Sequence, residues 1–439
     1  MANQQRNKEE LLLSEWGYLP VDGTNLHNNE ANGLFKAAEH AARELRLPEG
    51  AVLNRVVGGL KAGQVCGVIT HRGRSLEILP KIDGTGTESR LSLVRMLSVA
   101  YDLRVSEGEL AHLQTQRKTL LELLIGLFAR RLTHAMKGGL QRQYVHHQED
   151  LPFLRGSLDV GRQLSRRPVA PTLLMCRFDE LSENTPINRL LRATALRLLH
   201  VCRSSNTRRE LQVILDSFSR VAHTNSPLSE RIHLDRSSAA FSVLIPMARL
   251  LLRGDWQNTT SGRSAGTALL FPMNILFEQY ITKRAQQTLG RGIVRKQHSK
   301  HHALKNHLFQ LRPDLVFKYG DRPVILDTKW KQLDRTDPKK LRVSQSDIYQ
   351  MLAYGHSYTT AQQKPQLVLL YPHHADLNEP EGVLRQWSVT GSDLPLSIAT
   401  VDISKDRSAS DWVEFFSNVA PNHKPVVFGS SERSDGDQI

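Results

Sequence analysis

The sequence is poor in cysteine and has no long apolar run. Its three cysteines, Cys66, Cys176 and Cys202, are widely separated in a chain of 439 residues, so they predict neither a disulfide framework nor a zinc module. No stretch approaches the roughly 18 uninterrupted apolar residues of a membrane span. Residues 1–10 lack the apolar core of a signal peptide. We therefore expect a cytoplasmic protein that does not use a membrane.

The sequence also lacks two common site motifs. No Gly-x-x-x-x-Gly-Lys-Ser/Thr occurs, and the Gly-Thr-Gly-Thr-Glu stretch at 84–88 has no lysine, so the chain alone is not expected to hydrolyse a nucleotide. His298, His301 and His302 lie close together but have no second group of ligands at zinc spacing. A zinc site is therefore not expected.

Positive charge is abundant and unevenly placed. With 58 Lys and Arg against 44 Asp and Glu, the formal net charge is +14, which attracts polyanions. Between residues 283 and 307 the chain carries seven lysines and arginines, four histidines and no acid. Such a run predicts either salt-sensitive contacts with DNA phosphates or a solvated helix end and loop. Its candidate DNA contacts are Lys283, Arg284, Arg295, Lys296 and Lys300.

Two segments further along, 311–317 and 324–330, have apolar residues on both sides of polar ones. A Tyr-Gly-Asp-Arg-Pro stretch between them contains turn-forming residues, so the pair predicts a β-hairpin. Side chains alternate between faces along a strand, and Asp327 and Lys329 are therefore expected on the same face. Asp314, on the first strand, joins them if the strands pair in the right register.

This combination of residues fits metal-dependent cleavage of a phosphodiester bond. Mg²⁺ prefers carboxylate oxygens and keeps several waters, so Asp314 and Asp327 can hold it beside a phosphate. Lys329 is placed to stabilise developing negative charge, or to orient and deprotonate the attacking water. The same pattern also fits a surface hairpin that carries an ion pair, and the neighbouring segments help to decide between the two.

A helix is predicted before the hairpin, starting near Phe271. Its periodicity directs Ile275, Leu276 and Tyr280 toward a core. Glu278 lies on a turn near them, which makes a third carboxylate available.

A second helix is predicted after the hairpin, with Ser346 or Asp347 as its N-cap. Gln350 and Tyr354 are four residues apart and are therefore expected on one face of this helix.

Together these segments resemble the PD-(D/E)xK nuclease superfamily and, within it, McrC, the nuclease subunit of the McrBC modification-dependent restriction enzymes. The resemblance rests on the order of a helix with Phe-Glu, a strand with Arg-Pro-Asp, a strand with Leu-Asp-Thr-Lys-Trp-Lys, and a helix with Asp-Ile-Tyr-Gln-Met-Leu-Ala-Tyr. Segments at 66–82, 154–159 and 178–190 also resemble McrC. The similarity therefore covers most of residues 50–375.

The resemblance implies roles for single residues. The residues that match its catalytic positions are Asp314, Asp327, Lys329 and Glu278. The three carboxylates among them are the implied ligands of Mg²⁺, with Mn²⁺ as a possible substitute. Gln350 matches a helix position near the site. Lys331 has the same strand parity as Lys329, so it is either a substitute base, a phosphate contact or a solvated strand end.

The resemblance also implies a partner. McrC acts with McrB, a hexameric AAA+ motor that usually hydrolyses GTP and carries the module that recognises modified cytosine. The N-terminal part of McrC docks in that ring and stimulates hydrolysis. We therefore expect a DNA endonuclease subunit of a 5-methylcytosine-type restriction system for antiviral defence, in which two nuclease copies meet to cut both strands. The alternatives are a non-cleaving DNA-binding adaptor of an AAA+ motor and a stand-alone PD-(D/E)xK repair nuclease.

The predicted fold class is α+β with several domains. Residues 1–165 are expected to form a mostly β domain with helices that docks on the motor. Residues 166–420 are expected to form the endonuclease domain, with a helical lead-in at about 185–260 and a catalytic core at about 270–375. That core would be a mixed sheet flanked by helices, and 421–439 a disordered tail.

Three local predictions can be checked directly against the structure. Apolar spacing predicts a helix at 120–135 that ends before Gly138 and Gly139. Pro186, preceded by Asn184 or Thr185 as a cap, predicts the start of another helix. A stretch from 254 to 266, rich in Ser, Thr and Gly, predicts a loop that enters the catalytic core.

Overall fold

The computed structural model describes most of the chain. The described residues are 10–81, 86–114, 118–166, 172–253, 266–304, 306–320 and 322–420. The predicted tail at 421–439 lies outside these ranges, as does the predicted loop apart from its last residue. Among the described residues, no helix is both long and apolar enough to cross a membrane.

The N-terminal part is built on a four-stranded sheet in the order β1–β6–β5–β10. Its strands are β1 (Glu10–Ser14), β5 (Val65–His71), β6 (Arg74–Leu79) and β10 (Gly266–Pro272). Helix α2 (Asn28–Glu44) packs on this sheet through Leu34, Ala38 and Ala41. A second sheet contains β2 (Tyr18–Pro20), β3 (Leu53–Val56) and β4 (Gly59–Ala62). Strand β10 comes from far along the chain and pairs antiparallel with β5.

A group of helices follows the first sheet. They are α3 (Gly86–Ala100), α4 (Glu107–Gln114), α5 (Leu120–Ala135), α7 (Pro186–Val201), α8 (Ser205–Ser217) and α9 (Leu244–Arg253), with short turns η1 (Met136–Gly138), η2 (Pro227–Ser229) and η3 (Arg236–Phe241). The predicted bounds of α5 are confirmed. Thr185 caps α7 and Pro186 is its first residue, also as predicted, because proline needs no donor there.

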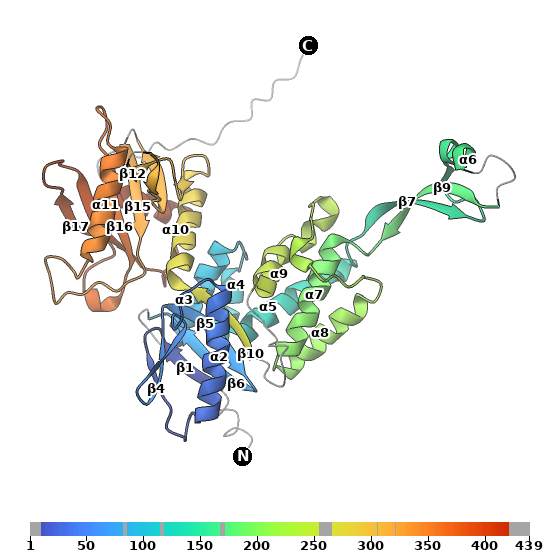
Figure 1. Cartoon of the computed structure of the whole chain (residues 1–439), viewed down its shortest axis with the longest axis horizontal. Helices are drawn as coiled ribbons and strands as arrows, with labels where there is room; N and C mark the ends of the chain where they lie inside the picture. Colours follow the sequence, from blue (N-terminus) through green and yellow to red (C-terminus); the bar gives the residue numbers. More distant parts are fainter. Residues whose placement is uncertain are drawn as a thin grey trace, which may run out of the picture.

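A narrow arm projects from this helical group. It consists of β7 (Gln143–Leu151), β8 (Ser157–Leu158), α6 (Val160–Arg166) and β9 (Leu174–Ser182), with β9 pairing antiparallel to both β7 and β8. The arm extends well beyond the rest of the chain (Figure 1). Strands β7 and β9 pair along their whole length. The predicted domain boundary at residue 165 therefore falls inside the arm.

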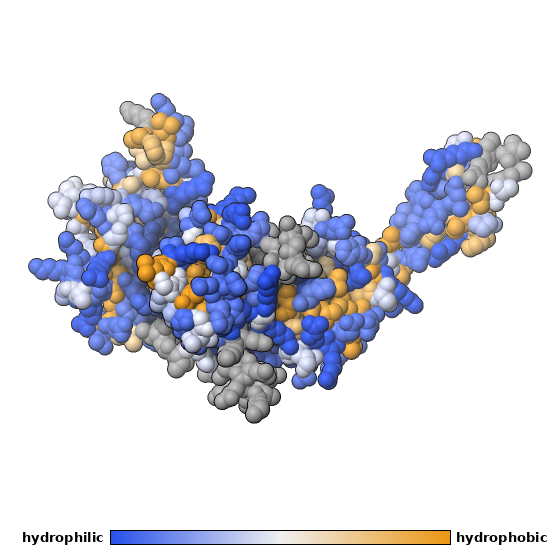
Figure 2. Space-filling view, turned by 60° about the horizontal axis from the view of Figure 1, so that its bottom comes forward, coloured by the Kyte–Doolittle hydropathy of each residue, from blue (hydrophilic) through white to orange (hydrophobic). Residues whose placement is uncertain are grey.

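The arm exposes apolar side chains near its end. Phe153 is 61% exposed, Leu154 57%, Val160 55% and Leu164 61%. Figure 2 shows hydrophobic residues on the distal part of the arm. Exposed large apolar side chains are common singly, but a group of them on a projecting element is typical of an interaction surface.

The C-terminal part is a six-stranded mixed sheet in the order β11–β14–β15–β16–β18–β17. Its strands are β11 (Arg295–Lys296), β14 (Leu315–Tyr319), β15 (Arg322–Thr328), β16 (Gln366–Pro372), β17 (Gly382–Ser388) and β18 (Pro395–Val401). Its helices are α10 (Met273–Leu289), α11 (Gln345–Tyr358), α12 (Ala409–Val419) and the short η4 (Ala375–Leu377). A small hairpin joins β12 (His302–Leu304) to β13 (Leu308–Gln310).

Helices cover both faces of this sheet. The side chains of Leu326 and Val368 pack with α10 and α12, whereas Ile325 and Leu367 pack with Met351 of α11. Alternate residues of each strand therefore enter different cores. The mixed α+β class with several sheets is confirmed, and the helices flank the mixed sheet as predicted.

Candidate active site

The predicted hairpin is confirmed, and its register brings the two aspartates together. Strand β14 pairs antiparallel with β15, and Leu315 lies opposite Leu326. One step further along the same register, Asp314 lies opposite Asp327. The strands are shorter than predicted: β14 starts after Asp314, and β15 ends at Thr328. The catalytic candidates thus lie at the end of the hairpin, where side chains can reach a substrate.

Asp314 is fixed by Thr328. Its Oδ2 accepts a hydrogen bond of 2.7 Å from the backbone N–H of Thr328 and one of 2.6 Å from the Thr328 hydroxyl. Burial raises the pKa of the Asp314 carboxyl, and these two hydrogen bonds and the charge of Lys329 oppose the shift. One carboxylate oxygen is therefore held and the other, Oδ1, is left for a ligand.

Asp327 and Lys329 form an ion pair, as their shared strand face predicts. Lys329 Nζ lies 2.5 Å from Asp327 Oδ2, and the side chain of Asp327 is only 1% exposed. Burial, followed by the charge of Asp314, raises the pKa of Asp327. Burial works against the charged amine of Lys329, but Asp327 and the other nearby carboxylates outweigh it and raise its pKa. Lys329 therefore keeps its proton at neutral pH.

Helix α11 holds this lysine from the other side. Lys329 Nζ donates to Gln350 Oε1 at 2.9 Å, and Gln350 Nε2 donates to the Tyr354 hydroxyl at 2.7 Å. The predicted shared face of Gln350 and Tyr354 is confirmed. The predicted N-cap is wrong: Ser344 holds that position, and Asp347 in the first turn instead binds Lys331 at 2.8 Å. Asp347 is thus a site residue that the sequence prediction missed.

Glu278 approaches the site from α10. Its pKa is raised by burial and then by the charge of Asp314, and its Oε1 accepts a 3.0 Å hydrogen bond from Gln297. Leu276 and Tyr280 are buried as predicted, but Ile275 is 41% exposed and was placed wrongly. No three His, Cys, Asp or Glu side chains within the described ranges form a complete metal centre.

The predicted DNA contacts fall into two sets. Lys283 is bound to Asp102 at 2.7 Å, and Arg284 lies over the rings of Tyr280 and Trp412; the structure does not bring these two to the site. The exposed members of the run that lie nearer the hairpin are Arg295, Lys296 and Lys300. Lys331 is half exposed, in keeping with the end of a strand.

The end of the hairpin is tied to the N-terminal sheet by Glu15, a residue that no local sequence pattern indicates. Trp330 Nε1 donates to Glu15 Oε1 at 3.1 Å and to Oε2 at 3.0 Å, and both residues are buried. Gln64 Nε2 donates to the Trp330 carbonyl at 2.5 Å. The residue between Lys329 and Lys331 is therefore held by the other half of the molecule.

Glu15→Gln is expected to become more stabilising, relative to wild type, as pH rises. Burial raises the pKa of Glu15 from 4.5 to about 7, against its hydrogen bonds. The folded state thus binds the proton more tightly, and wild-type stability falls as pH rises from about 4.5 to 7. Two and a half pKa units correspond to about 3 kcal/mol. Urea unfolding of both proteins at pH 4 and pH 8 measures this gap.

A gap that stays constant with pH would contradict the buried, protonated Glu15. Glu44→Gln is the matched control because Glu44 is exposed on α2, and its effect should not change over the same pH range.

Comparison with known proteins identifies the family of the chain. The family model described as "McrBC 5-methylcytosine restriction system component" matches residues 60–372, and the chain belongs to this family. The resemblance inferred from the sequence is thereby confirmed. A comparison with curated proteins finds no match.

Two solved structures have a similar fold. One is a chain of the half-complex from the tetradecameric assembly of Thermococcus gammatolerans McrB AAA+ hexamers with bound McrC. It has a TM-score of 0.71 and 20% identity, covering 93% of this chain and 99% of the other. The second is a chain of the cryo-EM structure of the Thermococcus gammatolerans McrBC complex. It has a TM-score of 0.53 and 23% identity, covering 64% of this chain and 88% of the other.

Proposed function

We propose that this chain is the Mg²⁺-dependent DNA endonuclease subunit of an McrBC-type restriction system. The observation that carries the proposal is the end of the β14–β15 hairpin, where Asp314, Asp327 and Lys329 converge under a helix. A mixed sheet flanked by helices with this constellation fits the PD-(D/E)xK class. Membership of the McrBC family supports the same assignment.

The donor set fits a hard divalent cation. Asp314 and Asp327 would hold Mg²⁺, with Glu278 beside them, since this ion needs only one or two protein carboxylates and completes its shell with water and phosphate. Burial is the main cause of the raised pKa values of these acids, and the charge of Asp314 adds to it for Asp327 and Glu278. When bound, the metal supplies polarisation of the phosphoryl oxygen and activation of water.

Side chains of the protein would stabilise the charge on the phosphate and hold one another in position. Lys329 Nζ lies 2.5 Å from Asp327 Oδ2, so its ammonium group is placed to stabilise negative charge on the phosphate. Gln350 orients the ammonium group, and Tyr354 supports Gln350 while donating to the Arg312 carbonyl at 3.0 Å. Lys331, held by Asp347, is placed for a phosphate contact.

The proposal includes an AAA+ McrB-like motor that hydrolyses GTP and recognises modified DNA. The two similar structures are a half-complex of McrB AAA+ hexamers with bound McrC and an McrBC complex. The N-terminal domain and the projecting arm are the docking elements, because a narrow arm with exposed apolar side chains fits a partner's channel or groove. Two copies of the nuclease would meet to cut both strands.

Cleavage in a reconstituted system tests the proposal. The chain is mixed with a McrB-like GTPase encoded beside it, GTP and either methylated or unmodified duplex DNA. We expect cutting that requires the motor and Mg²⁺ and stops with EDTA. Absence of cutting under every condition, with the motor still stimulated, would favour the non-cleaving adaptor. Full activity without a motor would favour a stand-alone nuclease.

Charge at the end of the arm is expected to weaken docking on the motor. Phe153→Asp together with Leu154→Asp places two carboxylates where an apolar contact is proposed. We expect the binding free energy to fall by about 2 kcal/mol, which corresponds to roughly 30-fold weaker association. Sedimentation of the complex and stimulated GTP hydrolysis measure it. Val213→Asp, on the exposed face of α8, is the control. Unchanged association of the double variant would remove the arm from the docking surface.

A further inference from the structure

A large groove is lined in part by β14 and by the turn of the β14–β15 hairpin, the end of the hairpin that is away from Asp314 and Asp327. Its volume is about 1220 Å³, which is larger than the roughly 300–1,000 Å³ of a typical small-molecule site. Residues from the end of α10, strands β11 and β14, and the end of α11 line it. Such a space suits a segment of a polymer better than a single small molecule.

One face of α11 connects the groove with the active site. Gln350, Tyr354 and Tyr358 follow one another at intervals of four residues, so they lie along the same side of the helix. Gln350 binds Lys329, and Tyr358 lines the groove. At 1.5 Å per residue the two ends of this row are about 12 Å apart.

The lining combines positive charge with aromatic and apolar surface. Arg295, Lys300 and Lys318 line the groove, and no aspartate or glutamate does so among the described residues. None of these three cations has an ion pair with a described acid within 4.0 Å. The remaining walls include Ile293 and Val316. Phosphate binding alone would not require these apolar walls.

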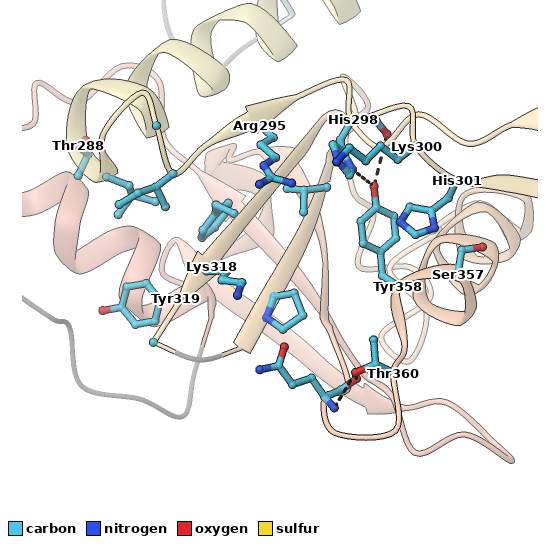
Figure 3. A pocket seen from close by; sticks show the side chains of 18 of the residues that line it. Thr288, Arg295, His298, Lys300, His301, Lys318, Tyr319, Ser357, Tyr358 and Thr360 are labelled. Atoms are coloured by element: carbon cyan, nitrogen blue, oxygen red, sulfur yellow. Dashed lines mark hydrogen bonds between the residues drawn. The ribbon is translucent and has the colours of Figure 1, made fainter.

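Rings gather at the end of the groove nearest α11. Figure 3 shows Tyr358 between His298 and His301. The His301 and Tyr358 ring centres are 4.2 Å apart, and the Tyr358 hydroxyl is hydrogen-bonded to His298 Nδ1. Burial, followed by the charge of Arg295, lowers the pKa of His298. The group offers ring faces on which a base can stack.

We propose that this groove binds a short unpaired stretch of a DNA strand, with Tyr358 about 12 Å along α11 from Gln350 of the proposed cleavage site. Tyr358 and His301 stack on a base, while Arg295, Lys300 and Lys318 hold the phosphates. Duplex DNA presents its bases stacked and paired, so only its backbone could use this surface. The inference rests on the proposed nuclease function for its purpose, but binding itself does not depend on cleavage.

Fluorescence anisotropy with the full chain in EDTA tests the groove without cutting. The probes are a labelled twelve-nucleotide oligo(dT), an abasic strand with the same number of phosphates, and a duplex of equal length. We expect oligo(dT) to bind at least about fivefold more tightly than the abasic strand. Tyr358→Ala should weaken oligo(dT) binding about tenfold and remove that preference, since stacking is worth roughly 1–3 kcal/mol per base.

Matched variants separate stacking from other effects. Tyr358→Phe keeps the ring and loses the hydrogen bond to His298, so it should bind like wild type and also guard against a folding artefact of the alanine variant. Tyr349→Ala removes an exposed tyrosine of the same helix and should have no effect. Lys300→Gln with Lys318→Gln should weaken all single strands and reduce the salt dependence.

Equal affinity for oligo(dT) and the abasic strand would overturn the proposal, as would a Tyr358→Ala protein that binds normally. Tighter binding of the duplex, insensitive to Tyr358, would make the groove a backbone contact for double-stranded DNA. A chain that passes this test but never cuts with its motor would retain the groove and lose the proposed nuclease function.

Discussion

Asp327→Ala is expected to lower DNA cleavage by at least about 1,000-fold while DNA association remains largely intact. This carboxylate is 1% exposed and lies opposite Asp314 at the end of the hairpin. Losing a group that acts on the reacting phosphate removes stabilisation present only in the transition state. Phosphate contacts elsewhere do not depend on it. Initial cleavage rates and filter binding of the same DNA measure the two quantities.

The fold should tolerate this change. Removing Asp327 relieves its repulsion with Asp314, and Lys329 keeps Gln350 at 2.9 Å and Asp347 at 4.0 Å. Asp376→Ala, at an exposed position of the same domain, is the control and should leave cleavage unchanged. If a folded Asp327→Ala protein still cleaves DNA, the assignment of the active site to the end of the hairpin is wrong.

The two lysines at the end of β15 are expected to differ sharply in importance. Lys329→Met should reduce cleavage at least about 100-fold, because the Lys329 side chain is only 18% exposed and its ammonium group contacts both Asp327 and Gln350. Lys331→Met should reduce it less than about threefold, since that side chain is 50% exposed and paired with Asp347. Single-turnover cleavage with saturating motor and GTP compares them directly.

The opposite order, with Lys331→Met the more damaging change, would make Lys331 the catalytic lysine. Similar large losses in both would indicate that the two ammonium groups share the phosphate. A Lys329→Arg protein adds a further measurement, because it keeps the charge but not the compact shape of the ammonium group.

Local sequence patterns predicted which of these side chains meet, because the central contacts among them are local. Asp327 is near the end of β15 and Lys329 follows two residues later, just past the strand, while Gln350 and Tyr354 are four apart on a helix. Simple periodicity therefore places each pair on one side. The hydrogen-bond partners of Asp314 were harder to predict from the sequence. Thr328 reaches it because Asp314 precedes its strand and turns toward the neighbouring backbone, a detail that face alternation does not include.

Long-range contacts could not be predicted from a single sequence. Glu15 meets Trp330 across 315 positions, and nothing in the local pattern around Glu15 indicates a buried acid. Strand β10 likewise carries an ordinary apolar pattern that gives no hint of its partner β5. Asp347 looked like a helix cap because caps are commonly acidic, but Ser344 begins the helix earlier and frees Asp347 to bind Lys331.

The return of β10 to the first sheet has a consequence for how the protein is made. Strand β5 receives its second neighbour only after the helical group and the arm have been synthesised. During synthesis on the ribosome, the β5 edge of the N-terminal sheet therefore stays unpaired until residue 272 has emerged. Helix α10, which bears Glu278, follows β10 without a break. During synthesis, the strand that completes the first sheet is therefore followed directly by the helix that carries Glu278 of the candidate active site.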